Sequence, residues 1–231
     1  MKDMLCRFYK INPKRVYVIE NFEEINKLLS FELRECPYQV SKIIGRDNFI
    51  VGYMGGTEAH RGLGYLLQSL KYLPKNIFDK IIILIIGPIS KYLKNFISKL
   101  PREHSSKIIL TGFLPFPLAL SVLMQADIVV LPYERNLYSM FALPNKICHY
   151  LYLKKTVIAT KLLSLERYFG EAIYFIYEPT PRKLAEALQK LYLDCGLRER
   201  LGYKGYTIVL ERNNWENISR KLLDIYLQLS R

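Results

Sequence analysis

The periodicity of hydrophobic positions changes repeatedly from residue 48 onward. Short apolar runs rich in Ile and Val alternate with longer segments in which Leu recurs every three or four positions. The apolar runs predict β-strands, and the recurring segments predict amphipathic α-helices. The predicted strands are 49–54, 80–86, 107–110, 127–131, 156–159 and 171–176. The predicted helices are 62–73, 90–100, 117–124, 144–153, 180–194, 197–203 and 214–230.

This alternation is typical of βαβ units with right-handed crossovers. Most of the apolar runs lack polar positions, as expected when helices cover both faces of a sheet. We therefore predict an α/β fold, a doubly wound Rossmann-like domain with a mainly parallel six-stranded sheet. Residues 1–47 form a lead-in, with a predicted helix at 1–10, a strand at 15–19 and a helix beginning near Asn21.

The charge balance points to anionic partners. The 231 residues include 34 Lys and Arg against 21 Asp and Glu, a net charge of +13. Nucleotide phosphates, nucleic acid and an anionic membrane surface all fit this charge, and so does a lysine-rich solvated surface. Nucleic acid is not expected, because basic and aromatic residues do not interleave. Basic residues along one helix and its exit favour an anionic membrane surface: Lys91, Lys94, Lys99 and Arg102.

The cysteines indicate a reducing compartment. Cys6, Cys36, Cys148 and Cys195 are scattered, with no CxxC motif and no His pair at ligand spacing. This spacing favours free thiols in a cytoplasmic protein over a zinc site, so no metal is expected. No apolar run reaches the roughly 18–20 residues of a membrane span, and the first residues do not build a signal peptide.

The stretch 131–160 is the first candidate site. A strand ends at Pro132, an irregular loop follows over 133–143, and Pro144 opens a helix. Ligands of open α/β sheets bind beyond the carboxyl ends of strands, and a long loop there favours a binding site. Lys146 would oppose the helix dipole in the first turn unless a phosphate lay beside it. The alternative is a lysine whose stem reaches solvent.

A glycine-rich turn over 53–64 is the second candidate. It lacks the GxGxxG spacing of a dinucleotide site and the lysine of a Walker loop. Gly55 and Gly56 nevertheless allow the backbone to approach a bulky anion, and Arg61 before Gly62 would share a phosphate with free N–H groups. The alternative is an ordinary strand-to-helix turn with an exposed arginine.

The order of these motifs resembles the C-terminal half of a GT-B glycosyltransferase. It is similar to the large retaining group 1 family that includes bacterial mannosyltransferases, sucrose synthase and glycogen synthases. Four further segments occur in that family's order and extend the resemblance over 49–231: ILTGF (109–113), ADIVVLPY (126–133), ALPNKICHYLYLKKTVIAT (142–160) and NWENISRKLLDIY (214–226). Residues 5–22 also resemble the family's link between its two domains.

The resemblance implies a domain organisation and an activity. Residues 1–47 would be the inter-domain link and the end of an absent acceptor domain, and residues 48–231 the donor-binding domain. The implied reaction is retaining transfer of a sugar from a UDP-type or GDP-type nucleotide sugar, without a metal. The acceptor domain would be supplied elsewhere or by a separate subunit. The alternative is a non-catalytic nucleotide-sugar-binding module or one subunit of a split enzyme. A lipid-linked acceptor would place the protein at the inner face of the membrane.

The resemblance also implies roles for individual residues. Arg61 and Lys146 would stabilise the departing diphosphate as catalytic residues. His149 stands where the family has the glutamate that holds the ribose, and Gly56 stands where many members have a second arginine. These departures favour binding over turnover. The implied binding residues are Gly55, Gly56, Gly62, Thr111, Gly112, Phe113, Asn145 and His149.

Overall fold

The computed structural model describes residues 2–24, 47–212 and 214–230. Within them lies one sheet in the order β3-β2-β1-β4-β5-β6, in which every strand pairing is parallel. The strands are β1 (Phe49–Met54), β2 (Ile81–Ile86), β3 (Ile108–Leu110), β4 (Ile128–Leu131), β5 (Thr156–Thr160) and β6 (Ile173–Ile176). The predicted doubly wound α/β fold is confirmed. The strand order reverses between β1 and β4, the place where ligands of such sheets bind.

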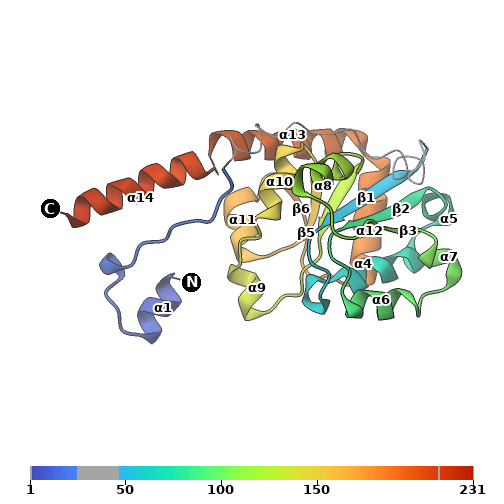
Figure 1. Cartoon of the computed structure of the whole chain (residues 1–231), viewed down its shortest axis with the longest axis horizontal. Helices are drawn as coiled ribbons and strands as arrows, with labels where there is room; N and C mark the ends of the chain where they lie inside the picture. The colour runs from blue at the N-terminus through green and yellow to red at the C-terminus, as the bar shows by residue number, and fades with distance from the viewer. Residues whose placement is uncertain (1, 25–46, 213, 231) are drawn as a thin grey trace.

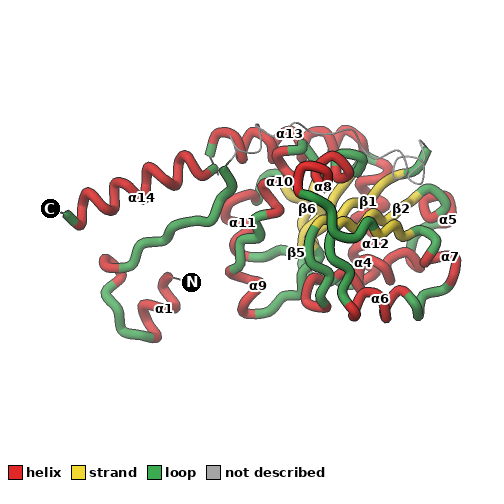
Figure 2. Tube along the Cα trace, in the orientation of Figure 1, coloured by secondary structure: helices red, strands yellow, loops and turns green. Residues whose placement is uncertain are grey.

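Helices cover both faces of the sheet (Figures 1 and 2). One core lies under α4 (Leu63–Ser69), α6 (Lys91–Ile97) and α12 (Pro181–Leu193). The other lies under α8 (Phe116–Leu123), α10 (Lys146–Tyr152), α11 (Leu163–Phe169) and α13 (Cys195–Glu211). Shorter elements are α1 (Lys2–Phe8), η1 (Pro13–Arg15), η2 (Ala59–Arg61), η3 (Leu70–Tyr72), α5 (Lys75–Phe78), α7 (Arg102–Ser105) and α9 (Leu137–Phe141).

Several predictions about individual segments were wrong. The predicted strand at 15–19 is absent, because η1 occupies its start and no described strand pairs with the extended residues that follow. Residues 21–24 are not helical, and the rest of the helix predicted near Asn21 lies outside the described residues. The predicted loop 133–143 contains α9, whose start is fixed by a capping box between Asn136 and Ser139.

The lead-in and the last helix extend from the same side of the sheet domain as two segments that diverge (Figure 1). We call α1, residues 9–24 and α14 (Trp215–Leu229) together the arm. The backbone N of Trp215 donates to the carbonyl of Glu23 at 3.0 Å, and Lys221 pairs with Glu20 at 2.7 Å. Phe22 anchors the arm in the core beneath α11. Beyond this anchor the arm leaves large apolar side chains exposed, among them Phe8 and Tyr226. None of the described helices combines the length and the apolar character that crossing a bilayer requires.

Candidate functional site

Glycines close the carboxyl ends of three neighbouring strands. Gly55 after β1, Gly87 after β2 and Gly112 after β3 have φ values of +129°, +132° and +71°, which favour glycine because other residues clash there. A Cβ on Gly87 would lie 2.5 Å from the carbonyl oxygen of Gly55. The three turns therefore approach one another closely at the sheet edge.

Gly62 joins the turn after β1 to the end of β4. It has φ +74°, and a Cβ there would lie 1.7 Å from the carbonyl oxygen of Pro132. This contact brings the preceding Arg61 beside the chain that leaves β4. Nη1 of Arg61 donates to the Tyr133 hydroxyl at 2.9 Å, and Nε lies 3.5 Å from the carboxylate of Glu58. Arg61 is therefore held at the switch point of the sheet, immediately before α4.

Lys146 points inward from the first turn of α10. Its Nζ donates to the Tyr53 hydroxyl at 3.1 Å and lies 4.3 Å from the centre of the Tyr53 ring. The residue keeps some exposed surface, yet its ammonium is buried, and a Cβ on Gly55 would lie 2.4 Å from it. Burial lowers the pKa of Lys146 to about 7, and the nearby Arg61 lowers it further against the opposing Glu58. The interpretation as a lysine whose stem reaches solvent was therefore wrong.

Next to Lys146 lies an apolar cavity of about 280 Å³. It opens at the carboxyl ends of β1 and β2, and its wall is almost wholly carbon. Phe113, at 79 % relative exposure, stands at the cavity, and Gly55, Lys146 and His149 also line it. The apolar face of a flat ring fits such a wall, with charged groups attached on the Lys146 side. The remaining carbon surface comes from Met54, Ile86, Pro88, Leu114, Phe116 and Ala119.

His149 is held beneath the cavity by two neighbours. Its Nε2 lies 3.2 Å from Oε2 of Glu23, and its ring meets the Phe116 ring edge-on at 4.9 Å. Burial lowers the pKa of His149, and the Glu23 carboxylate partly offsets this effect. Both ring nitrogens are covered, and neither has hydrogen-bond geometry to a partner among the described residues. In this arrangement the imidazole presents carbon to the cavity, whose wall is almost wholly carbon.

The other predicted binding residues lie around this centre. The carbonyl of Gly56 accepts from the Tyr53 hydroxyl at 2.5 Å, beside Lys146. Thr111 lies at the end of β3 and donates its hydroxyl to the carbonyl of Gly112 at 2.9 Å. Asn145 is exposed at the start of α10 and accepts a hydrogen bond from Asn21 of the arm at 2.9 Å. Neither Thr111 nor Asn145 lines the apolar cavity.

Sequence reasoning missed three residues that position Lys146, the turn after β1 or His149. Tyr53 contacts Lys146 but lies within a strand pattern that marks it as core. The hydroxyl oxygen of Tyr150, on α10, accepts from the backbone N of Met54 at 2.8 Å, and no sequence signal marks this tyrosine as a functional group. Glu23 lies in the lead-in and reaches His149 only through tertiary structure. In the described part of the chain, no group of three or more His, Cys, Asp or Glu residues is arranged to hold a metal ion.

Comparison with known proteins shows which family this chain resembles. The model of the family "Glycosyl transferases group 1" matches residues 39–208. An uncharacterized glycosyltransferase of Methanocaldococcus jannaschii is 21 % identical over 229 residues, which are 98 % of this chain and 57 % of the relative. The chain therefore spans little more than half the length of that relative.

Solved structures show the same fold. A glycosyltransferase from Rickettsia africae superposes with a TM-score of 0.77 at 20 % identity, covering 100 % of this chain and 61 % of its own. HepE of Anabaena in complex with UDP superposes with a TM-score of 0.74 at 15 % identity, covering 96 % and 60 %. Because the family model matches well over half of its residues, the chain belongs to the group 1 glycosyltransferases.

Proposed function

We propose that this chain is the donor-binding half of a retaining glycosyltransferase and binds a nucleotide-diphosphate sugar. The observation that carries the proposal is an apolar cavity lined by Lys146, whose ammonium lies against the same Tyr133 ring as Arg61 at the switch point of the sheet. A nucleotide sugar combines a flat base, a ribose, a dianionic diphosphate and a sugar in a row. The cavity matches the base, and the two cations match the diphosphate.

The base would enter the apolar cavity. Phe113 and Phe116 supply aromatic surface there, and the backbone of 111–113 supplies polar groups to the edge of a base. HepE, which shares the fold, is known in complex with UDP and with UDP-glucose. We therefore infer a UDP-type donor in preference to a GDP-type donor. His149 would contact the ribose from below, in the position that the family gives to a glutamate.

The diphosphate would lie between Arg61 and Lys146, over Gly55, Gly56 and Gly62. During transfer the bond from the sugar to the diphosphate breaks, and negative charge grows on the departing diphosphate. Lys146, whose ammonium is buried, would stabilise such charge strongly, because water does not screen it and it needs no reorganisation. Arg61 is partly exposed and would add a second, partly screened positive charge. Lys146 has a pKa of about 7, so a bound diphosphate would hold it in the protonated form.

The acceptor would be bound outside the sheet domain. The chain covers only 57–61 % of the relatives' length, and its arm exposes apolar side chains on α1 and α14. We infer that residues 1–47 link residues 48–231 to an acceptor-binding domain or subunit that contacts this arm. Lys91 and Lys94 are exposed on α6, Lys99 in the turn that follows it and Arg102 at the start of α7. These charges support an anionic membrane surface near the site.

Isothermal titration with UDP, GDP, UDP-glucose and GDP-mannose tests the proposal. We expect UDP-glucose to bind, and Arg61→Gln to weaken it by at least about tenfold, as for a lost charge-assisted contact. Arg200→Gln removes an exposed arginine on α13 and serves as the control. The proposal fails if none of the four ligands binds at millimolar concentration. Binding without sugar transfer would favour the alternative, a non-catalytic module or one subunit of a split enzyme.

A further inference from the structure

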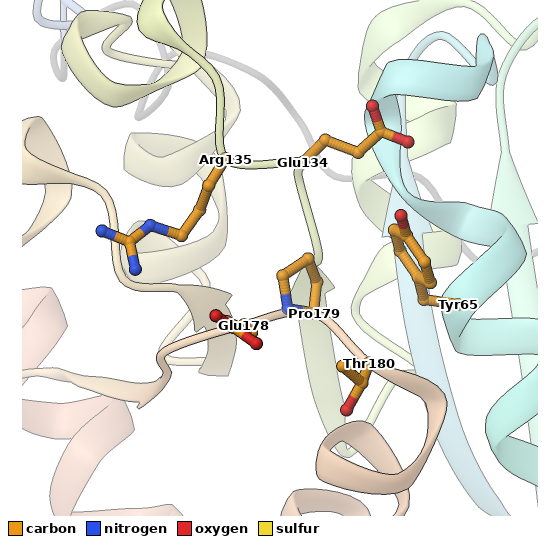
Figure 3. A pocket seen from close by; sticks show the side chains of 6 residues that line it. All are labelled: Tyr65, Glu134, Arg135, Glu178, Pro179 and Thr180. Atoms are coloured by element: carbon orange, nitrogen blue, oxygen red, sulfur yellow. The ribbon is translucent and has the colours of Figure 1, made fainter.

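A second cavity opens at the carboxyl ends of β4 and β6, apart from the residues assigned to the nucleotide. It holds about 570 Å³, a size typical of small-molecule sites. Its walls come from α4, from the loop after β4 and from the turn between β6 and α12 (Figure 3). The lining residues are Tyr65, Glu134, Arg135, Glu178, Pro179 and Thr180.

Glu134 is fixed on one side of this pocket. Its backbone N donates to the carbonyl of His60 at 3.3 Å, and its own carbonyl accepts from Oγ of Ser139 at 2.5 Å. The Tyr65 hydroxyl is directed toward the Glu134 carboxylate (Figure 3). Burial raises the pKa of Tyr65, and the carboxylate raises it further. The fold therefore sets the position of this carboxylate.

The opposite side is formed by Arg135 and the turn before α12. Nη1 of Arg135 donates to the carbonyl of Tyr177 at 3.3 Å. The neighbouring Glu178 is exposed, and Pro179 separates it from the Tyr65 side (Figure 3). Thr180 caps α12 by accepting from the backbone N of Lys183 at 3.3 Å. Carboxylates thus stand on two sides of the pocket, with donors beside each of them.

These groups select the class of ligand. Two carboxylates against one guanidinium repel an anion, and the largely polar wall disfavours a lipid tail. A metal is not expected, since none of the described residues form a group of three or more metal-binding side chains. Carboxylates accept hydrogen bonds from hydroxyls, while tyrosine, threonine and arginine donate them. Tyr65 and Pro179 add carbon surface for C–H groups. Neutral saccharides present this combination.

We propose that the pocket between Tyr65, Glu134 and Glu178 binds a saccharide separately from the nucleotide. A smaller adjoining cavity of about 110 Å³ shares Tyr65 and Glu134, adds Gln68 and Tyr92, and reaches Gly62 at the border of the proposed diphosphate site. The bound saccharide can therefore extend along α4. The hydrogen bond from Glu134 to His60 places the pocket next to the turn that carries Arg61. A role in holding a saccharide acceptor rests on the proposed function, whereas saccharide binding does not.

Amide chemical-shift mapping of the full chain tests this site. The probes are methyl α-glucoside, methyl α-mannoside and maltotriose, at concentrations up to about 100 mM. We expect at least one probe to shift the amides of Tyr65, Glu134 and Thr180 and to leave those of Gly55 and Phe113 unchanged. Glu134→Gln keeps the shape of the side chain and is expected to weaken binding at least about tenfold. Glu103→Gln removes an exposed carboxylate on α7 and is expected to change nothing.

Saturating UDP separates this site from the nucleotide site. We expect the shifts caused by the saccharide to persist when UDP is present. The proposal is overturned if no probe shifts these amides, if Glu134→Gln binds as tightly as the unmodified chain, or if UDP displaces the saccharide. Tyr65→Phe provides a second variant, because it keeps the ring and removes the hydroxyl that contacts Glu134. If the chain binds a saccharide but does not bind UDP, the proposed nucleotide site is refuted and the proposed saccharide site stands.

Discussion

The cleft around Lys146 and the pocket around Glu134 open at the same edge of one sheet. Their charged groups nevertheless differ in sign and in how deeply they are buried. In the cleft, an ammonium is buried against Tyr53 beside an apolar cavity. In the pocket, Glu134 is half-buried and Glu178 is exposed, and polar atoms dominate the wall. The Arg61–Gly62 turn and the loop after β4 separate the two.

The two regions differ in how their charged groups affect the free energy of folding. A buried ammonium without a carboxylate partner opposes folding, and the lowered pKa of Lys146 records that cost. The exposed carboxylate of Glu178 remains hydrated and costs little. A region that retains a destabilising cation is suited to a ligand that neutralises it. A region of hydrated polar groups is suited to a neutral ligand that replaces water.

The largest expected effect comes from the glycine that shapes the cleft. Gly62→Ala would place a Cβ against the carbonyl of Pro132 at positive φ, and we expect the free energy of unfolding to fall by about 3 kcal/mol or more. Gly112→Ala has a similar φ and no described atom within 4 Å of its Cβ, so we expect a loss of about 1–2 kcal/mol. Urea unfolding measures both. Equal losses would show that the contact with Pro132 does not shape the cleft.

Lys146→Met is expected to separate ligand binding from stability. Removing the buried ammonium should raise the free energy of unfolding by about 1 kcal/mol or more. It should also weaken UDP-glucose binding by about a hundredfold, because the diphosphate loses a buried cation. Urea unfolding and isothermal titration give the two values, and Lys94→Met on the exposed face of α6 is the control. If the variant loses stability and retains its affinity for UDP-glucose, Lys146 is not part of the binding site.

The pH dependence of UDP-glucose binding follows from the pKa of Lys146, about 7 in the free protein. Below that pH the lysine is already protonated, so affinity should be constant. Above it, binding must take up a proton, and affinity should fall by up to about tenfold per pH unit. Titrations in buffers of different ionisation enthalpy should show this uptake. Lys146→Met should lose the slope, and Glu134→Gln should keep it.

Salt provides the smallest contrast between the two regions. Raising sodium chloride from about 0.05 to 0.5 M should weaken UDP-glucose binding a few-fold, because Arg61 is partly exposed and screened. Saccharide binding at Glu134 should not change, because that ligand is neutral. Isothermal titration and chemical-shift titration follow the two ligands. Equal salt dependence at both sites would contradict the assignment of the charged ligand to the cleft.

The sheet could be predicted from sequence because its strands are continuous apolar runs, and burial on both faces leaves few other structures for them. The same reasoning failed at 15–19, where alternating residues lie along an arm with no described strand to pair with. It also missed α9, because its start depends on a local capping box between Asn136 and Ser139 rather than on an apolar period. Periodicity therefore predicts elements that pack against a core and misses those that local hydrogen bonds define.

The candidate site was predictable in part. Arg61 and Lys146 stand beside glycine and proline signals that mark turns and helix starts, so their place at the sheet edge could be expected. The burial of the Lys146 ammonium could not, because it depends on Tyr53 in β1 and on the absent Cβ of Gly55. Glu23 reaches His149 from more than a hundred positions away in the chain. Contacts of that kind exist only in the folded protein.

Chemical-shift mapping with UDP-glucose tests the nucleotide cleft most directly. We expect saturating UDP-glucose at neutral pH to shift the amides of Gly55, Gly87 and Phe113, which surround Lys146 and the apolar cavity. The amides of Glu134 and Glu178 should move much less. Shifts confined to Glu134 and Glu178, or no shifts at millimolar ligand, would contradict the placement of the nucleotide sugar in the cleft.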